Sequence, residues 1–164
     1  MISEEYLREL SKRTDLHLYQ QEKDYLLKLF LYFYYSSFED VVFKGGTCLK
    51  YVHGLNRFSE DLNFELVVEP EKFQDQVEKV LEEIEKIGIE SEYIKEERFD
   101  KAYTAEIAFR GPRYDGSKHS RNKFRIDAGE RLGLVVEPRW RFIESEYPET
   151  RNRFSVLVMG EEEL

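Results

Sequence analysis

Cysteine and long apolar segments are scarce in this sequence. Cys48 is the only cysteine among 164 residues, so no disulfide can form within the chain, and such sparing use of cysteine is typical of reducing compartments. The N-terminus is acidic and amphipathic, which does not fit a secretory signal. The most apolar stretch, residues 25–35, is interrupted by Lys28 and is shorter than the roughly 20 residues that span a membrane. These absences predict a cytoplasmic protein without a membrane partner.

Two familiar site patterns are also missing. The three histidines, His17, His53 and His119, are scattered, and no HxH, HExxH or CxxC spacing is present. A typical zinc site is therefore excluded. The GxxxxGK[ST] spacing of a P-loop is absent as well, so a Walker-type phosphate loop is not expected.

Charge is abundant but unevenly distributed. Hydrophobic residues make up 41% of the chain, which is ample for a core despite 36% charged residues. The net charge of −9 disfavours nucleic acid, yet residues 1–97 hold 12 Lys and Arg against 22 Asp and Glu, whereas residues 98–153 hold 13 against 9. Such asymmetry hints at a nucleic-acid face. Six cations either follow an RNA backbone or balance the acidic helix expected at residues 75–85: Arg110, Arg113, Lys118, Arg121, Lys123 and Arg125.

Hydrophobic periodicity predicts a mixture of helices and strands. We expect helices over residues 3–12, 17–36, 47–53 and 70–87, and strands over residues 41–43, 61–68, 89–95, 102–110, 123–129 and 154–159. Helices that return between strands favour an α+β (mixed α/β) fold. We expect one domain over residues 1–164, with the N-terminal helices of residues 1–40 packed on a mixed sheet.

A glycine pair lies between an expected strand and the helix that follows it. Gly45, Gly46 and Thr47 follow the apolar run of residues 41–43 after one residue, Lys44. Glycines at a helix start let a phosphate approach the backbone N–H groups, and the helix dipole favours the anion. Thr47 adds a hydroxyl donor, and Lys44 extends either to a phosphate or to solvent. A plain structural turn explains the same residues.

Acidic and amide side chains alternate on the next expected strand. Asp61 and Asn63 point to one face, with Glu65 two residues further on. Carboxylates beside a phosphate-binding turn supply ligands for Mg²⁺, and Asp127 is the candidate for a third ligand from a neighbouring strand. Asp127 fits equally well as a strand-edge carboxylate that pairs with an arginine.

Two segments resemble the AbiEii-type nucleotidyltransferase toxins. They are EKDYLLKLFL (22–31) and FKGGTCLKYVHGLNRFSEDLNFEL (43–66), and the family pattern joins KGGT to RFSEDLDF before a third aspartate on a later strand. The likeness is close over about residues 19–68 and loose over 121–130. It implies the minimal nucleotidyltransferase fold of the DNA polymerase β superfamily.

The resemblance implies a role for each matching residue. Gly45, Gly46 and Thr47 would hold the phosphates of an NTP, and Arg57 and Ser59 would orient the next strand or contact phosphate. The implied metal ligands, for Mg²⁺ or Mn²⁺, are Asp61, Asn63 and Asp127. The implied reaction transfers NMP to RNA, tRNA included, or to a protein, and a cognate antitoxin is an implied partner.

Two departures from the family pattern leave two hypotheses open. Asn63 stands where the family has its second aspartate, and an amide brings no negative charge to a metal site. The chain also stops at Leu164, before the helical half that is usual in the family, which we expect to be absent. The protein is either an active toxin or a catalytically silent or truncated member that binds a nucleotide or a partner.

Overall fold

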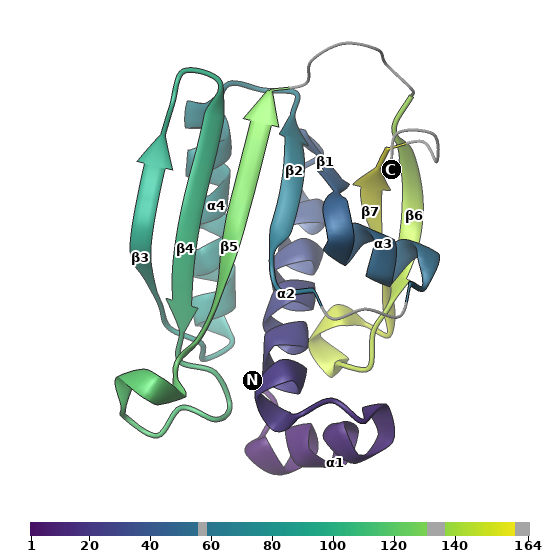
Figure 1. The fold of residues 1–164 in the computed structure, drawn as a ribbon, viewed down its shortest axis with the longest axis vertical. Helices are drawn as coiled ribbons and strands as arrows, with labels where there is room; N and C mark the ends of the chain where they lie inside the picture. Colours follow the sequence, from purple (N-terminus) through teal and green to yellow (C-terminus); the bar gives the residue numbers. More distant parts are fainter. Residues whose placement is uncertain (56–58, 131–136, 160–164) are drawn as a thin grey trace.

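The computed structural model describes residues 1–55, 59–130 and 137–159. Within these ranges the helices are α1 (Glu4–Thr14), α2 (Leu18–Ser37), α3 (Gly45–His53) and α4 (Pro70–Lys86), with short 3-10 turns η1 (Lys118–Ser120) and η2 (Pro148–Thr150). The strands are β1 (Val41–Lys44), β2 (Leu62–Leu66), β3 (Ser91–Arg98), β4 (Ala102–Phe109), β5 (Asn122–Glu130), β6 (Arg139–Glu144) and β7 (Arg153–Val158). They form one seven-stranded mixed sheet in the order β3-β4-β5-β2-β1-β7-β6 (Figure 1).

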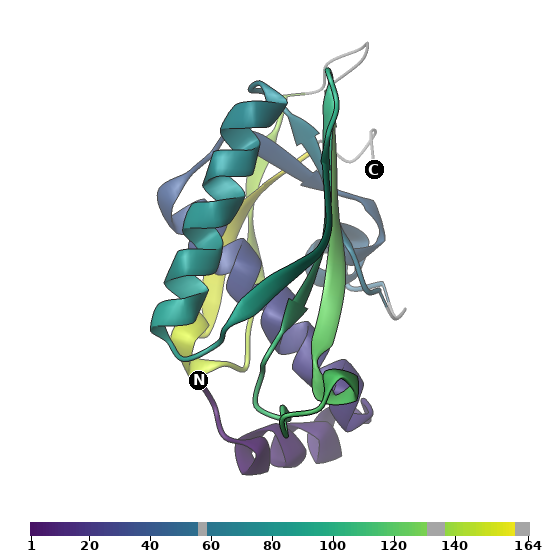
Figure 2. The same ribbon diagram turned by 90° about the vertical axis from the view of Figure 1, so that its left-hand side faces the viewer.

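The two long helices α2 and α4 lie on one face of the sheet, and α3 lies on the opposite face (Figures 1 and 2). Strand β2 shows why the layers form: Leu62, Phe64 and Leu66 are buried toward the helices, whereas the residues between them are half-buried. Phe64 meets Phe73 of α4 and Tyr34 of α2 at ring-centroid distances of 5.7 and 6.2 Å. Aromatic packing between helices and sheet therefore makes the core.

Helix ends follow the local chemistry of the sequence. The Ser3 side chain caps α1 by accepting a hydrogen bond from the Tyr6 backbone at 3.0 Å. Pro70 begins α4, where its missing N–H costs nothing. Gly54 ends α3 in the left-handed conformation, at φ 70°. The expected α+β class is thus confirmed, and every expected helix and strand is present.

Strand β6 was not predicted. It carries Arg139, Arg141 and Glu144, and its two large apolar side chains, Trp140 and Phe142, are 46% and 57% exposed. The alternation of Arg139, Trp140, Arg141 and Phe142 is short, and its large apolar side chains stay exposed at the sheet edge, so the pattern is a weak signal. β6 nevertheless pairs with β7 along its whole length, from Arg139 with Val158 to Glu144 with Arg153.

Helix α2 is buried around most of its circumference over its N-terminal half. Charged residues there, Glu22, Lys23, Asp24 and Lys28, are at most 6% exposed. Each has an oppositely charged or hydrogen-bonding partner outside α2, as buried charges require. In the described ranges no helix is long and apolar enough to cross a bilayer.

Candidate functional site

The site begins where β1 turns directly into α3. Lys44 is the last residue of β1, and Gly45 is the first of α3. Gly45 has φ +83°, and a Cβ atom at this position would lie 2.9 Å from the Asn63 amide nitrogen. The turn therefore needs glycine for its conformation and for its close approach to β2.

Strand register brings three polar residues into one row. Lys44 of β1 is the partner of Asn63 of β2 in an antiparallel pair, and Asn63 is the partner of Asp127 of β5 in a parallel pair. Partners on neighbouring strands point to the same face of a sheet. The row lies on the face opposite the core, because Phe64 and Ala128, which alternate with it, are buried under the helices.

Asp61 joins this row from the segment just before β2. Its Oδ1 accepts a hydrogen bond from the backbone N–H of Arg125 at 3.1 Å, so its carboxylate reaches across to β5. The Arg125 side chain in turn pairs with Asp127, at 3.2 Å between Nη2 and Oδ1. Asp127 and, more weakly, Asp61 raise the pKa of the Arg125 guanidinium above its ordinary value. Asp61, Asn63 and Asp127 are therefore close neighbours.

The predicted nucleotide-binding residues that the structure describes differ in what they contact. The Thr47 hydroxyl is buried and bonds to the Ser59 hydroxyl and to the Asp61 carbonyl, so both hydroxyls fasten the start of α3 to the segment before β2. Lys44 lies 3.5 Å from Glu65, and Arg57 lies outside the described residues. Gly45 and Gly46 form the first turn of α3.

The donor set suits one divalent ion better than two. Among the described residues no group of three or more His, Cys, Asp or Glu side chains is placed to hold a metal. Two carboxylates, Asp61 and Asp127, and the Asn63 amide are what the site offers. Mg²⁺ is commonly held by one or two carboxylates together with substrate phosphates and water. The residues present fit that arrangement.

Lys23 and Arg125 were not predicted as site residues. Lys23 of α2 is 5% exposed and lies 3.6 Å from Glu60, next to Asp61. Nothing in the periodicity of α2 distinguishes this lysine from a solvated one. Arg125 had a signal, because it lies two residues before Asp127 on the same face of β5. The alternative interpretation of Asp127, as an acid paired with an arginine, describes the observed contact.

The basic series of residues 110–125 is largely engaged in ion pairs. Arg110, Arg113 and Arg121 pair with Glu90, Glu22 and Glu92 at 2.8, 3.5 and 2.9 Å. Glu90 directly precedes β3, Glu22 lies on α2, and Glu92 lies on β3. None of these three ion pairs involves the acidic helix at 75–85, so the contacts of these arginines differ from the alternative in which the series balances that helix.

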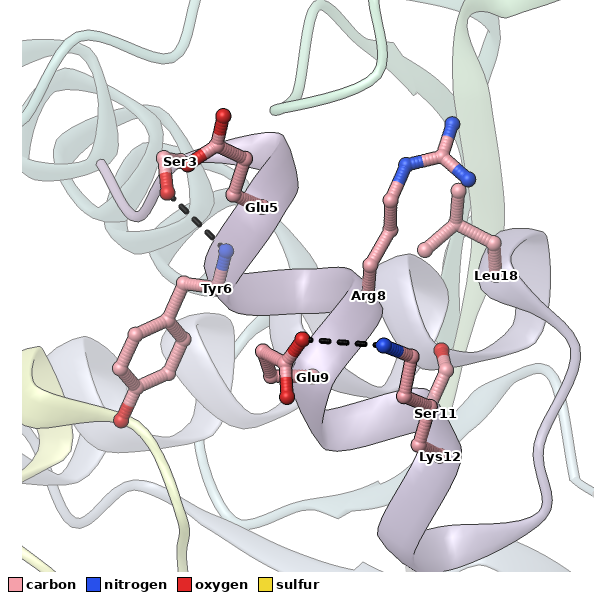
Figure 3. Close-up of a pocket in the computed structure, with 8 residues that line it drawn as sticks. All are labelled: Ser3, Glu5, Tyr6, Arg8, Glu9, Ser11, Lys12 and Leu18. Atoms are coloured by element: carbon pink, nitrogen blue, oxygen red, sulfur yellow. Dashed lines mark hydrogen bonds and ion pairs between the residues drawn. The ribbon is translucent and has the colours of Figure 1, made fainter.

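A cavity beside α1 lies away from this row. It has a volume of about 760 Å³ and runs along α1 and the start of α2. Figure 3 shows the side chains that line it, among them the intrahelical pair of Glu9 and Lys12 and the Ser3 cap. None of the predicted site residues lines this cavity, so it does not belong to the candidate site.

Comparisons with known proteins place the chain among nucleotidyltransferases. The family model described as nucleotidyl transferase AbiEii toxin, Type IV TA system, matches residues 32–164. The nucleotidyltransferase toxin MenT4 from Mycobacterium tuberculosis is similar in structure, with a TM-score of 0.68 at 18% identity over 99% of this chain and 56% of that one. JHP933 from Helicobacter pylori gives 0.58 at 18% identity, over 88% and 53%. No protein with a curated description matches.

The two solved structures inform on the fold of this chain and on how much of each related protein it covers. At 18% identity they show that the nucleotidyltransferase fold is shared. The chain spans about half the length of these solved structures.

Proposed function

The chain belongs to the AbiEii nucleotidyl transferase toxin family, and from this premise we propose that it is a metal-dependent nucleotidyltransferase. It would transfer a nucleoside monophosphate from an NTP to an acceptor RNA, with tRNA as the first candidate, or to a protein. The row of Lys44, Asn63 and Asp127 beside the Gly45 turn carries the proposal. With Asp61 it sets two carboxylates next to a glycine turn at a helix start, where the phosphates of an NTP would bind for nucleotidyl transfer.

Each part of the row has a task in that reaction. The NTP phosphates lie against the backbone N–H groups that open α3, where the positive end of the helix dipole favours an anion. Asp61 and Asp127 hold Mg²⁺ or Mn²⁺, with the Asn63 oxygen as a neutral ligand. The ion, when bound, neutralises the phosphates and aligns them for attack. Lys44 contributes positive charge from the end of β1.

The setting of the activity follows from the family. A toxin of this class works in the cytoplasm, where NTPs and RNA are found, and a cognate antitoxin protein holds it in check. Phosphate backbones of an acceptor RNA would meet the surface near Lys118, a cation of the basic series that forms no ion pair with other described residues.

Label transfer tests the proposal directly. Each of four α-labelled NTPs is incubated with tRNA or with total RNA, in Mg²⁺ and in Mn²⁺. We expect labelled RNA from the chain and at least a hundredfold less from Asp61→Asn, since losing a metal-binding carboxylate removes phosphate neutralisation. Asp100→Asn is the matched control, because Asp100 is an exposed carboxylate away from the row. Equal NTP binding and labelling by Asp61→Asn and the unmodified chain would refute the proposal.

A second candidate is a nucleotide- or partner-binding protein without turnover. Asn63 favours it, because an amide in the middle of the row leaves two carboxylates where the family pattern has three. Asn63→Asp should then raise Mn²⁺ affinity by about tenfold through the added charge, and only this variant should label RNA. The matched control is Thr104→Asp, which puts the same charge on the other neighbour of Asp127. Equal gains from both variants would show a general charge effect only.

A further inference from the structure

The Arg125 side chain forms an ion pair with Asp127, which is one of the two carboxylates that would bind a metal ion. Its Nη2 lies 3.2 Å from Asp127 Oδ1, and the two side chains are 54% and 36% exposed. The contact joins one guanidinium nitrogen to one oxygen, without the double hydrogen bond of the strongest arginine–carboxylate pairs. An exposed ion pair of this geometry contributes little to stability, so the side chain can leave Asp127 at low cost.

The backbone of Arg125, in contrast, is held in place. Arg125 lies within β5, where it is the partner of Glu106 on β4. Its N–H donates to Asp61 Oδ1 at 3.1 Å. The residue is thereby tied to both carboxylates of the row, to Asp61 through its main chain and to Asp127 through its side chain. Only the long side chain is free to change partner.

A divalent ion and a guanidinium compete for Asp127. Both are cations that need the same carboxylate, and they repel one another at contact distance. An NTP brings an alternative partner for the guanidinium, since its phosphates carry more negative charge than one carboxylate and match the planar fork of arginine. The turn at Gly45, where those phosphates would lie, is across β2 from Arg125.

We infer that Arg125 is a phosphate-binding residue that rests on Asp127 in the nucleotide-free protein and moves to the NTP when a divalent ion takes its place. This inference rests on the proposed function, since it assigns the nucleotide to the same row. The guanidinium balances one of the two carboxylates while the site is empty of metal. The ion alone therefore binds weakly, and the ion together with an NTP binds well.

Two binding constants test the exchange without any measurement of activity. Mn²⁺ alone is titrated and followed by electron paramagnetic resonance, and a non-hydrolysable NTP analogue is then titrated calorimetrically at saturating Mn²⁺. For Arg125→Gln we expect Mn²⁺ to bind about two- to fivefold more tightly, because its competitor is gone. The analogue should bind at least about tenfold more weakly, because a charge-assisted contact to phosphate is lost.

Two further variants sharpen the test. Lys123→Gln removes a positive charge from the same face of β5, two residues away, and should move neither constant. Arg125→Lys keeps the charge without the fork, so Mn²⁺ affinity should stay near that of the unmodified chain while the analogue binds less tightly. Matched far-ultraviolet circular dichroism checks that all variants are folded.

The outcomes test the Arg125 exchange and the proposed function separately. Opposite shifts of the two constants in Arg125→Gln support the exchange. Shifts in the same direction, an unchanged Mn²⁺ constant, or equal shifts in Lys123→Gln overturn it, while analogue binding by the unmodified chain leaves the proposed function standing. An unmodified chain that binds neither Mn²⁺ nor the analogue overturns the proposed function, and the inference with it.

Discussion

Gly45 lies so close to the Asn63 side chain that no room is left for a Cβ atom. Gly45 combines a positive φ of 83° with a 2.9 Å distance from its would-be Cβ to the Asn63 amide nitrogen. Gly116 offers a comparison within the same chain, because its φ is +99° and no atom lies within 4 Å of its would-be Cβ. Both glycines therefore have a positive φ, but only Gly45 also has a side chain, that of Asn63, in the space that a Cβ atom would fill.

Alanine at these two positions should separate strain from contact. Gly116→Ala should lower the free energy of unfolding by about 1–2 kcal/mol, the cost of a left-handed non-glycine residue. Gly45→Ala should lower it by a further 1–3 kcal/mol or so, because Asn63 must shift, and it should also weaken NTP binding. Urea denaturation and calorimetric titration measure the two effects. Equal losses of stability in the two variants would show that the contact with Asn63 is unimportant.

The sequence predicts the members of the row but not their register. Alternation along residues 61–66 indicates that Asp61 and Asn63 share a face, and a strand over residues 123–129 places Asp127 among buried neighbours. That Asn63 lies between Lys44 and Asp127 depends on strand order, which long-range packing decides. The contact of Arg125 with Asp127 is different, because both residues lie on β5 and their spacing of two is a local signal that the sequence already carries. The assigned roles of these residues stay predictions.

At the scale of elements, α2 and α3 are joined by a buried polar network. Asp24 of α2 accepts hydrogen bonds from Tyr51 of α3 at 2.6 Å and from Tyr147 at 2.5 Å. Lys28 lies 3.5 Å from Asp24 and 3.2 Å from Glu146. Because α3 begins with the Gly45 turn, this network fixes the helix that would receive the phosphates. Buried networks of this kind stabilise only while every member keeps its partners.

Asp24→Asn should therefore destabilise the protein by about 2–4 kcal/mol. The amide keeps the shape of the side chain but withdraws the charge that faces Lys28, and it presents a donor to hydroxyl groups that donate. Urea denaturation measures the loss, and the rate at which Cys48 of α3 reacts with a thiol reagent should rise with it. Burial raises the pKa of the Cys48 thiol to about 12, so in the intact fold that reaction is slow.

An exposed acid provides the comparison for Asp24. Asp75 of α4 is exposed, and Asp75→Asn should change the free energy of unfolding by less than about 0.5 kcal/mol. A loss of similar size in both variants would mean that overall charge matters and the network does not.

Helices and strands differ in how far the sequence foretells them. α4 alternates apolar and charged residues at helical spacing from Pro70 onward, because one of its faces packs on β3 and β4 and the other meets water. α2 has no such alternation over its N-terminal half, yet its length and apolar content still indicate a helix. β6 alternates only over Arg139 to Phe142, and its pairing with β7 at the sheet edge leaves Trp140 and Phe142 exposed, so its pattern is too short to identify a strand. Edge strands of this kind need the three-dimensional structure to be found.

At the scale of the whole molecule, many tyrosines have phenol groups that are removed from water. Of 11 tyrosines in the chain, burial raises the pKa of seven above the ordinary value near 10: Tyr25, Tyr34, Tyr35, Tyr51, Tyr93, Tyr103 and Tyr147. Neighbouring carboxylates add to the effect at Tyr25, Tyr51 and Tyr147. In the folded protein these phenols keep their protons where unfolded ones would lose them.

Stability should therefore fall steeply as the pH rises above about 10. The folded pKa values are raised, so the folded state binds more protons than the unfolded state above the unfolded pKa near 10. The stabilisation is complete below that pH and is lost above it, by up to about 1.4 kcal/mol per pH unit for each such tyrosine. Urea denaturation between pH 8 and pH 11 measures how fast the free energy of unfolding falls with pH. Tyr147→Phe should make this slope shallower by up to the contribution of one tyrosine, about 1.4 kcal/mol per pH unit. A free energy of unfolding that stays constant to pH 11 would show that these phenols ionise freely in the fold.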